Sequence, residues 1–371
     1  RARSGEIDHV VFLGDYIYEY PTGEYAGKSG VARMHHPEWE ISTLEDYRQR
    51  HGRYRTDLNL QAAHAACPWI VVWDDHESAN DSWLDGAENH TDGRVEGQWH
   101  ERLGNAEQAY FEWLPVRARS AEDDDQLLYR SFTFGTLAQL IMMDLRSYRS
   151  EQTTGDQSVD AERTMLGKKQ FNWLAQQLQD SDARWDVLGN SVMISPMRFV
   201  TVQNNDKANV ASGYMQERAT GITVNSDQWD GYAWARNRLF DELAADDANV
   251  LFLTGDIHTE WVNSIVHNGQ EIGCELVTSS ISAANVGDTV TTYTKVYHPE
   301  NNPVSLLAED FLRKLNPAVK HVDLDAHGYA VARIRPTEVG MEFYRVADYE
   351  NPESPVGVAA TYTWRAGVGY V

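Results

Sequence analysis

The sequence has few cysteines, comparatively few basic residues and no long hydrophobic run. Only Cys67 and Cys274 are cysteines among its 371 residues, which excludes a disulfide scaffold and gives no zinc-ribbon spacing. We expect each of them to be a small buried hydrophobic residue. No apolar run approaches the ~18 residues that a membrane-spanning helix needs, and no signal-peptide pattern is visible.

Acidic residues outnumber basic ones, with 56 Asp and Glu against 32 Lys and Arg and a formal net charge of −24. This balance argues against a protein that holds duplex nucleic acid or an anionic membrane through a broad basic face. It does not exclude a phosphorylated small substrate, because bound metal ions can reverse the local electric field.

The composition is that of a folded chain with a sizeable core. Hydrophobic residues make up 42%, and twelve Trp and eighteen Tyr exclude a disordered or low-complexity chain. The length allows two domains at about 150 residues each, but it also suits one large α/β domain. The apolar run Val10–Leu13 begins almost at once, so we expect that upstream sequence has been removed.

Short apolar runs alternate with amphipathic stretches along most of the chain. We expect strands at Val10–Leu13, Ile70–Trp73, Gln139–Met143, Trp185–Leu188, Val250–Leu253 and Glu275–Val277. Their weak alternation is typical of strands covered on both faces. Helical spacing predicts helices at Leu166–Leu178, Trp229–Leu243 and Leu306–Leu315. The repetition indicates a layered α/β domain.

The C-terminal part changes character. Alternation in Gly328–Ile334 and Gly340–Val346, with Pro336 between them, predicts a β-hairpin. Long polar loops are expected at 88–97, 204–213 and 285–302.

Polar side chains follow four of the predicted strands. The four segments are Gly14-Asp15-Tyr16-Ile17-Tyr18-Glu19, Asp74-Asp75-His76-Glu77-Ser78-Ala79-Asn80, Asp144-Leu145-Arg146 and Thr254-Gly255-Asp256-Ile257-His258. Ligands of open α/β sheets bind outside the carboxyl ends of the strands, so these side chains should meet at one edge. One such segment would mean little because Asp is common in turns, but four together favour a metal site.

Spacing within the segments suits metal ligation. Asp256 and His258 are two residues apart, which places both side chains on one side of an extended chain. Asp15 and Tyr18 are three apart, so a turn can bring the carboxylate and the phenol together. Asp15 is the best candidate to bridge two metals because glycine precedes it. Hard oxygen ligands favour calcium, magnesium, manganese or a ferric ion over a soft-metal site.

Other catalytic motifs are absent or incomplete. The segment 76–80 begins like a His-Glu-x-x-His zinc helix but ends in Asn80. There is no Gly-x-Ser-x-Gly elbow and no Gly-x-x-x-x-Gly-Lys-Ser/Thr phosphate loop. The segment 323–328 partly resembles a calcium loop, but its twelfth position would be Ile334 rather than glutamate.

Taken together, the motifs resemble the alkaline phosphatase D family, within the calcineurin-like metallophosphatases. They are Leu13–Tyr20, Trp73–Glu77, Asp144–Arg149, Trp229–Tyr232 and Gly255–His258, with Val277–Ser282 following. The resemblance implies a four-layer α/β core in which a central β-sandwich is flanked by helices. It also implies that residues 1–371 are the catalytic domain without its N-terminal part, normally preceded by a β-rich domain. A periplasmic or secreted location follows from the resemblance alone.

The same resemblance implies a centre with one ferric ion and calcium ions, with another divalent metal as an alternative. By carry-over, Asp15 bridges metals, Tyr18 is a phenolate ligand of iron, and Asn80 binds calcium. Asp256 and His258 complete the metal shell. The family's cysteine ligand lies upstream of its Gly-Asp-Tyr motif, and neither cysteine of this sequence occupies that position.

The catalytic candidates are Asp15, Asn80, Arg146 and His258. Arg146 would steady the phosphate, which its planar fork suits, or a neighbouring carboxylate. A structural salt bridge is the competing interpretation for Arg146 and Arg149. Asp75, His76 and Glu77 are either ligands themselves or groups that orient Asn80.

We expect a metal-dependent phosphoesterase that hydrolyses phosphomonoesters, and by the family resemblance phosphodiesters as well, through metal-activated water or hydroxide, with no serine intermediate. Its partners are small phosphate esters, and the oligomeric state stays open. One alternative is a phosphodiesterase on the same site, either phospholipase D-like or acting on nucleotides. The alternative from another class is a non-catalytic metal-binding or carbohydrate-binding domain, which is weaker because the candidate ligands follow several strands rather than one loop.

Overall fold

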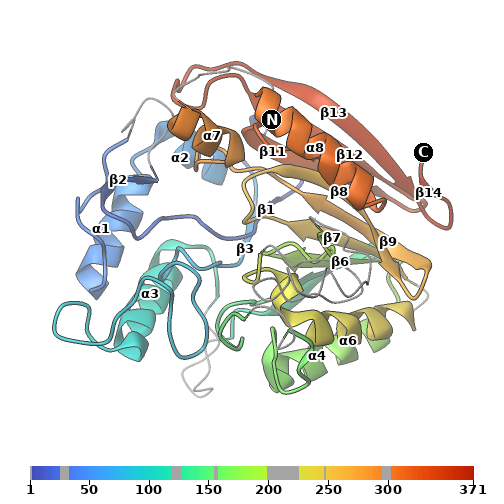
Figure 1. The fold of residues 1–371 in the computed structure, drawn as a ribbon, viewed down its shortest axis with the longest axis horizontal. Helices are drawn as coiled ribbons and strands as arrows, with labels where there is room; N and C mark the ends of the chain where they lie inside the picture. Colours follow the sequence, from blue (N-terminus) through green and yellow to red (C-terminus); the bar gives the residue numbers. More distant parts are fainter. Residues whose placement is uncertain are drawn as a thin grey trace, which may run out of the picture.

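The computed structural model describes residues 2–25, 33–117, 127–153, 158–198, 225–245, 248–294 and 302–371. Among these residues, strands form one mixed, one parallel and one antiparallel sheet with helices beside them (Figure 1). In this part of the chain, no helix combines the length and apolar character that crossing a membrane requires.

The largest sheet has seven strands in the order β10-β8-β9-β7-β6-β5-β4. The strands are β4 (Arg130–Phe134), β5 (Ala138–Met142), β6 (Trp185–Asn190), β7 (Asn249–Thr254), β8 (Glu260–His267), β9 (Gln270–Val277) and β10 (Val319–Asp323). The four inner strands β5, β6, β7 and β9 run parallel, and the outer pairs are antiparallel. Every residue of β5 and β6 is buried, as predicted for strands covered on both faces.

Two smaller sheets lie beside it. Strands β1 (Val10–Phe12) and β3 (Trp69–Val71) pair in parallel, and a short strand β2 (Thr22–Tyr25) follows β1. The third sheet is antiparallel and contains β11 (Gly328–Arg335), β12 (Glu338–Val346), β13 (Val356–Arg365) and β14 (Gly369–Tyr370). Strands β11 and β12 confirm the predicted C-terminal hairpin.

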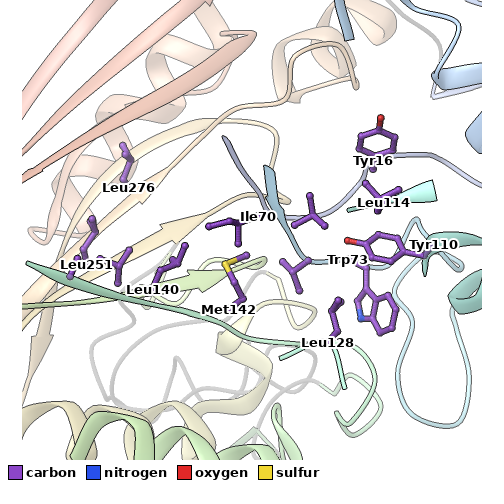
Figure 2. Packing of buried hydrophobic residues seen from close by; sticks show 14 of the residues in the cluster. Tyr16, Ile70, Trp73, Tyr110, Leu114, Leu128, Leu140, Met142, Leu251 and Leu276 are labelled. Carbon is purple, nitrogen blue, oxygen red and sulfur yellow. The ribbon is translucent and has the colours of Figure 1, made fainter. Parts of the chain in front are cut away.

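One face of the large sheet packs on both smaller sheets. Strand geometry sends successive side chains to opposite faces, so Leu251 joins this core while Phe252 points the other way. Phe343 of β12 belongs to the same cluster. Figure 2 shows the cluster running from Leu276 of the large sheet past Ile70 of β3 to the aromatic rings of Trp73 and Tyr110.

Helices α4 (Gly167–Gln179) and α6 (Ala233–Ala244) cover the opposite face of the large sheet. Phe171 and Leu174 of α4 and Leu239 of α6 lie in a cluster with the side chains of Ile141 and Phe252. A 3-10 turn η4 (Trp229–Tyr232) precedes α6, so the predicted helix at 229–243 is two joined elements. Helix α8 (Pro303–Leu315) confirms the third predicted helix.

The structure contains further helices that the apolar pattern did not predict. These are α1 (Leu44–Tyr54), α2 (Leu58–Ala66), α3 (Trp99–Trp113), α7 (Val286–Thr294) and the short η1 (Ala2–Ser4). The loop expected at 285–302 is therefore wrong where α7 stands, whereas 88–97 has no helix or strand. The loop expected at 204–213 lies outside the described residues. Cys274 is buried as predicted, but Cys67 is only partly buried.

Candidate metal centre

The carboxyl ends of β1, β3 and β7 open onto one cavity of about 320 Å³. The residues on its wall are Asp15, Asp75, His76, Asn80, Asp81, Asn225, Asp227, Asp256, Ile257, His258, Ala284, Val286 and Thr289. Four of the predicted metal ligands, Asp15, Asn80, Asp256 and His258, are therefore brought together although they are far apart in the sequence. The carboxylates on the wall make this cavity strongly acidic.

Two overlapping groups of side chains are close enough to share a cation. The ligand atoms of Asp15, Asp75 and His76 all lie within 4.8 Å of one another, and the same holds for Asp74, Asp75 and Asp256. Asp15 Oδ1 is buried and has no hydrogen-bond partner among the described residues. Because an unpaired buried carboxylate oxygen is costly unless a cation neutralises it, these side chains fit hard metal ions.

Tyr18 stands behind this wall and joins two of its residues. Its hydroxyl lies 3.2 Å from Asp15 Oδ2 and 2.9 Å from His258 Nε2. His258 Nε2 is itself 3.5 Å from Asp15 Oδ2. The other ring nitrogen, Nδ1, lies 2.8 Å from the carbonyl oxygen of Ala284 and donates to it. That bond leaves Nε2 as the nitrogen available to the centre.

The backbone around these ligands is unusual. Asp15, Asp256 and His258 have φ angles of 57°, 67° and 55°, in the left-handed region that non-glycine residues rarely adopt. Such conformations persist where surrounding contacts hold them, and they cluster at functional sites. Gly14 has φ 117°, and a Cβ there would lie 2.3 Å from Asp74 Cβ. Only glycine therefore lets the ends of β1 and β3 approach this closely.

The crowded carboxylates perturb one another. Burial raises the pKa of Asp75 to about 7, and burial together with the charges of Asp74 and Asp227 raises the pKa of Asp256 well above its usual range. Burial lowers the pKa of His76, but the carboxylates of Asp75, Glu19 and Asp15 outweigh it and raise that pKa well above 6.5. A cation favours ionised carboxylates, so its binding here releases protons.

Arg146 holds carboxylates together rather than lining the cavity. It is 3% exposed, and its guanidinium makes two bonds to Asp74, at 2.5 and 2.9 Å. A third bond of 2.8 Å reaches Asp227 and a longer contact of 3.4 Å reaches Asp256. Of the roles considered for Arg146, this geometry fits the steadying of neighbouring carboxylates. Arg149 also binds Asp227.

Glu77 ties the ends of β1 and β3 together. Its carboxylate accepts the backbone N–H groups of Asp15, Tyr16 and Asp74, at 3.1, 2.5 and 2.8 Å. Glu77 was predicted to be a ligand or a group that orients Asn80, whereas its contacts are with the residues around Asp15.

The side-chain amide of Asn80 donates to Glu88 at 3.2 Å, and the backbone of Asn80 is held by Glu19. Glu19 is fully buried and accepts hydrogen bonds from His76 Nδ1 at 2.8 Å, the backbone N–H of Asn80 at 2.7 Å and Asn89 Nδ2 at 2.9 Å. The bond to Nδ1 turns His76 Nε2 toward the cavity. Sequence reasoning missed Glu19 as an organising residue, although it ends the Gly14–Glu19 segment.

Asp74, Asp81 and Asp227 were also missed as parts of the site. Asp74 begins the Asp74–Asn80 segment and Asp81 directly follows it, so their negative charge beside the predicted ligands could have placed them in the site. Asp227 precedes the Trp229–Tyr232 motif, and no spacing singled it out. Its place becomes visible only through its bonds to Arg146 and Arg149.

Comparison with known proteins adds to this geometry. The family model described as PhoD-like phosphatase matches residues 1–343. The chain belongs to the PhoD-like phosphatase family. It is 32% identical over 370 residues to alkaline phosphatase D of Bacillus subtilis (strain 168), an alignment that covers 97% of this chain and 58% of that protein. The resemblance inferred from the motifs is thereby confirmed.

A solved structure titled "Structure of PhoD" aligns with this chain at a TM-score of 0.83 and 31% identity. The alignment covers 100% of this chain and 66% of the solved one. The predicted α/β class with flanking helices is therefore confirmed. The chain spans about 58% of the length of the curated relative that it matches.

Proposed function

We propose that the chain is a metal-dependent phosphoesterase of the alkaline phosphatase D type, which hydrolyses phosphomonoesters and also phosphodiesters. The observation that carries this proposal is the set of ligand atoms of Asp15, Asp75 and His76 within 4.8 Å of one another, with Asp15 Oδ1 unpaired among the described residues. An acidic cavity repels a phosphate ester unless cations reverse its charge. Cations bound in this cavity would attract a phosphate ester, which favours a catalytic role for them over a purely structural one.

The residues that would hold the metals are Asp15, Tyr18, Asn80, Asp256 and His258. Their oxygen and imidazole donors suit a ferric ion with calcium, as the family resemblance implies, or another divalent metal. Metal ions in such a site supply Lewis acidity toward phosphoryl oxygens and lower the pKa of water. Asp75 and His76 are added to this set only because their ligand atoms lie within 4.8 Å of that of Asp15.

The chain's own residues prepare the cavity for that chemistry. Arg146 and Glu77 fix the positions of the carboxylates, and the Ala284 carbonyl fixes the imidazole of His258. Ile257 and Val286 form an apolar part of the wall on which the organic portion of an ester can rest. The cavity wall holds no serine or cysteine among the described residues, so a covalent intermediate on either is not part of the proposal.

Three further proposals rest on the family resemblance. The packed sheets with helices outside them form the β-sandwich of a four-layer metallophosphatase core. Residues 1–371 act as a catalytic domain that works with an upstream β-rich domain and with a cysteine ligand upstream of the Gly-Asp-Tyr motif. The protein is periplasmic or secreted.

The test measures initial rates on p-nitrophenyl phosphate and bis-p-nitrophenyl phosphate for protein loaded with ferric iron and calcium. Asp15→Asn is the informative variant, because asparagine tolerates the left-handed backbone at this position. Asp241→Asn, which removes an exposed carboxylate paired with His267, is the matched control. We expect hydrolysis by wild type and Asp241→Asn, and none by Asp15→Asn.

Two outcomes would overturn the proposal. The first is an Asp15→Asn variant that retains the wild-type rate. The second is a metal-loaded wild type that binds ions and hydrolyses neither ester, which would favour a non-catalytic metal-binding domain. The ratio of the two rates separates a phosphomonoesterase from a phosphodiesterase.

A further inference from the structure

The imidazole of His258 depends on a carbonyl group from a distant loop. His258 follows β7 with a left-handed backbone, so no regular strand fixes the direction of its ring. Its Nδ1 donates to the Ala284 carbonyl oxygen at 2.8 Å. The Ser279 hydroxyl shares its one proton between the carbonyl oxygens of Ala326 and His258, the latter at 3.0 Å. The loop between β9 and α7 therefore holds His258 from both its ring and its backbone.

The residue after Ala284 begins a reciprocal cap on α7. Asp288 donates its backbone N–H to Asn285 Oδ1 at 2.9 Å, and Asn285 donates its backbone N–H to Asp288 Oδ2 at 3.3 Å. The Thr289 hydroxyl also donates to the Asn285 carbonyl at 3.0 Å. This pattern is a capping box, which fixes the entry of the chain into a helix and hence the position of Ala284.

The cap is anchored on the turn between β10 and β11. Asn285 Nδ2 donates to the Asp325 carbonyl at 2.8 Å, and Asp288 Oδ2 lies 2.9 Å from His327 Nε2. The His327 ring packs on Tyr349 with ring centres 4.0 Å apart. Gly287 comes so close to this turn that a Cβ on it would lie 2.0 Å from Asp325 Oδ1. The contact is thus built into the fold rather than incidental.

Ser280, His327 and Asp288 have the residue types of a serine-hydrolase triad, but their geometry does not activate the serine. Ser280 Oγ is 3.4 Å from His327 Nδ1 and donates its proton to the Ala283 carbonyl at 2.6 Å. The hydroxyl therefore serves the same loop that presents Ala284. The group acts as a brace and not as a second catalytic site.

We propose that Asn285, Asp288 and His327 are positioning residues that hold the Ala284 carbonyl against His258 and so keep its Nε2 directed into the metal centre. The proposal rests on the proposed function for its catalytic consequence, but its effect on cation binding is independent of catalysis. The same brace fixes Val286 and Thr289 on the cavity wall.

The experiment compares two disrupting variants with a conservative one. His327→Phe keeps a ring against Tyr349 and removes both nitrogens, so it preserves packing while it removes the bond to Asp288. Asp288→Ala removes the cap, and Asp288→Asn retains an acceptor oxygen. Ser305→Ala is the matched control, because the Ser305 hydroxyl binds Asp325 Oδ1 at 2.6 Å in the same turn but touches no member of the cap.

Calcium affinity is measured by isothermal titration of each folded protein, and kcat and KM are measured on p-nitrophenyl phosphate. Loss of a residue that orients a metal ligand costs about 10–100-fold in affinity or activity. We expect a loss of that size in calcium affinity and kcat for His327→Phe and Asp288→Ala, with a smaller change in KM. Asp288→Asn should recover most of the loss, and Ser305→Ala should bind calcium like wild type even where its thermal midpoint falls.

The proposal is overturned if His327→Phe binds calcium as tightly as Ser305→Ala. It is also overturned if all variants lose affinity in proportion to their loss of thermal stability. If wild type hydrolyses no ester while His327→Phe still loses calcium affinity, the proposed function fails and the brace stands. Should Asp288→Ala not fold, His327→Phe and Asp288→Asn carry the test.

Discussion

His76 and His51 are both buried against the segment that follows β1, yet their surroundings favour opposite protonation states. His76 faces Asp15, Asp75 and Glu19, which raise its pKa well above 6.5 in spite of burial. His51 is stacked between the rings of Tyr16 and Trp113, with centre distances of 6.1 and 6.3 Å. Burial, with a smaller contribution from Arg55, lowers its pKa to about 3.

The comparison teaches that burial alone does not mark a functional histidine. Neither ring nitrogen of His51 has a hydrogen-bond partner among the described residues, so the ring behaves as an apolar packing group. The chain separates the two environments within a few residues. Tyr16 points its hydroxyl to His64 at 2.9 Å on the aromatic side, whereas Tyr18 reaches Asp15 and His258 on the acidic side.

The largest effect is expected on the acidic side, from Asp15→Asn. Loss of a carboxylate that neutralises and positions metal ions removes several kcal/mol of transition-state stabilisation, so kcat should fall by at least about a thousandfold. The thermal midpoint of the metal-free variant should fall modestly, because in spite of burial the charge of His76 and the hydrogen bond to His258 hold the pKa of Asp15 below its usual range, and asparagine loses that attraction. Steady-state kinetics beside thermal unfolding checks both statements, and a midpoint at or above that of wild type would contradict the second.

Removal of metal ions should affect the acidic side next. Dialysis against a chelator is expected to abolish hydrolysis. Added calcium should raise the thermal midpoint, because calcium at one hundred times its dissociation constant adds about 2.7 kcal/mol to the free energy of unfolding. Sodium chloride at matched ionic strength controls for screening. A midpoint that rises equally with sodium chloride would show that no specific cation site stabilises the protein.

A smaller loss is expected from Glu19→Gln, which weakens the hold on His76 and Asn80 while preserving side-chain volume. Activity should fall about 10–100-fold, since Glu19 orients groups at the centre without being one of the proposed ligands. Glu40→Gln is the control, because Glu40 binds Arg102 at 2.9 Å and, among the described hydrogen bonds, reaches neither His76 nor Asn80. Equal losses in the two variants, measured on the same ester, would remove the special role of Glu19.

The smallest effect is expected at His51 on the aromatic side, and it appears only in how the free energy of unfolding changes with pH. Between about pH 6.5 and pH 3 the unfolded chain binds a proton at His51 that the folded protein does not, so wild type loses stability as the pH falls through this window. The slope from one such group is at most about 1.4 kcal/mol per pH unit. His51→Phe should lose correspondingly less between pH 6.5 and 4.5 in urea unfolding, and parallel curves would refute the assignment.

Some of this architecture could be predicted from the sequence because local patterns carry it. An apolar strand followed by Gly-Asp locates Asp15 and Asp256. Amphipathic stripes in the sequence locate helices α4 and α6. Strand β8 could not be found this way. Its buried polar side chains interrupt the apolar pattern, as with Asn263, which donates to Glu275 at 3.0 Å.

Helix α7 and the partners of Arg146 were out of reach for a different reason. The sequence of α7 contains glycine and several threonines, which are weak helix formers, and its cap is secured by His327 from another part of the chain. Arg146 could be read as a phosphate binder or as an ion-pair partner. Only the fold reveals that Asp74, Asp227 and Asp256 surround it.

The most direct test of the account is to locate ions in crystals grown with calcium and ferric iron, by anomalous scattering. We predict peaks inside the cavity at coordination distance from Asp15 and from Asp75, His76 or Asp256, at about 2.3–2.6 Å for calcium to oxygen. A map in which the cavity holds no ion, while ions bind elsewhere on the protein, would contradict it.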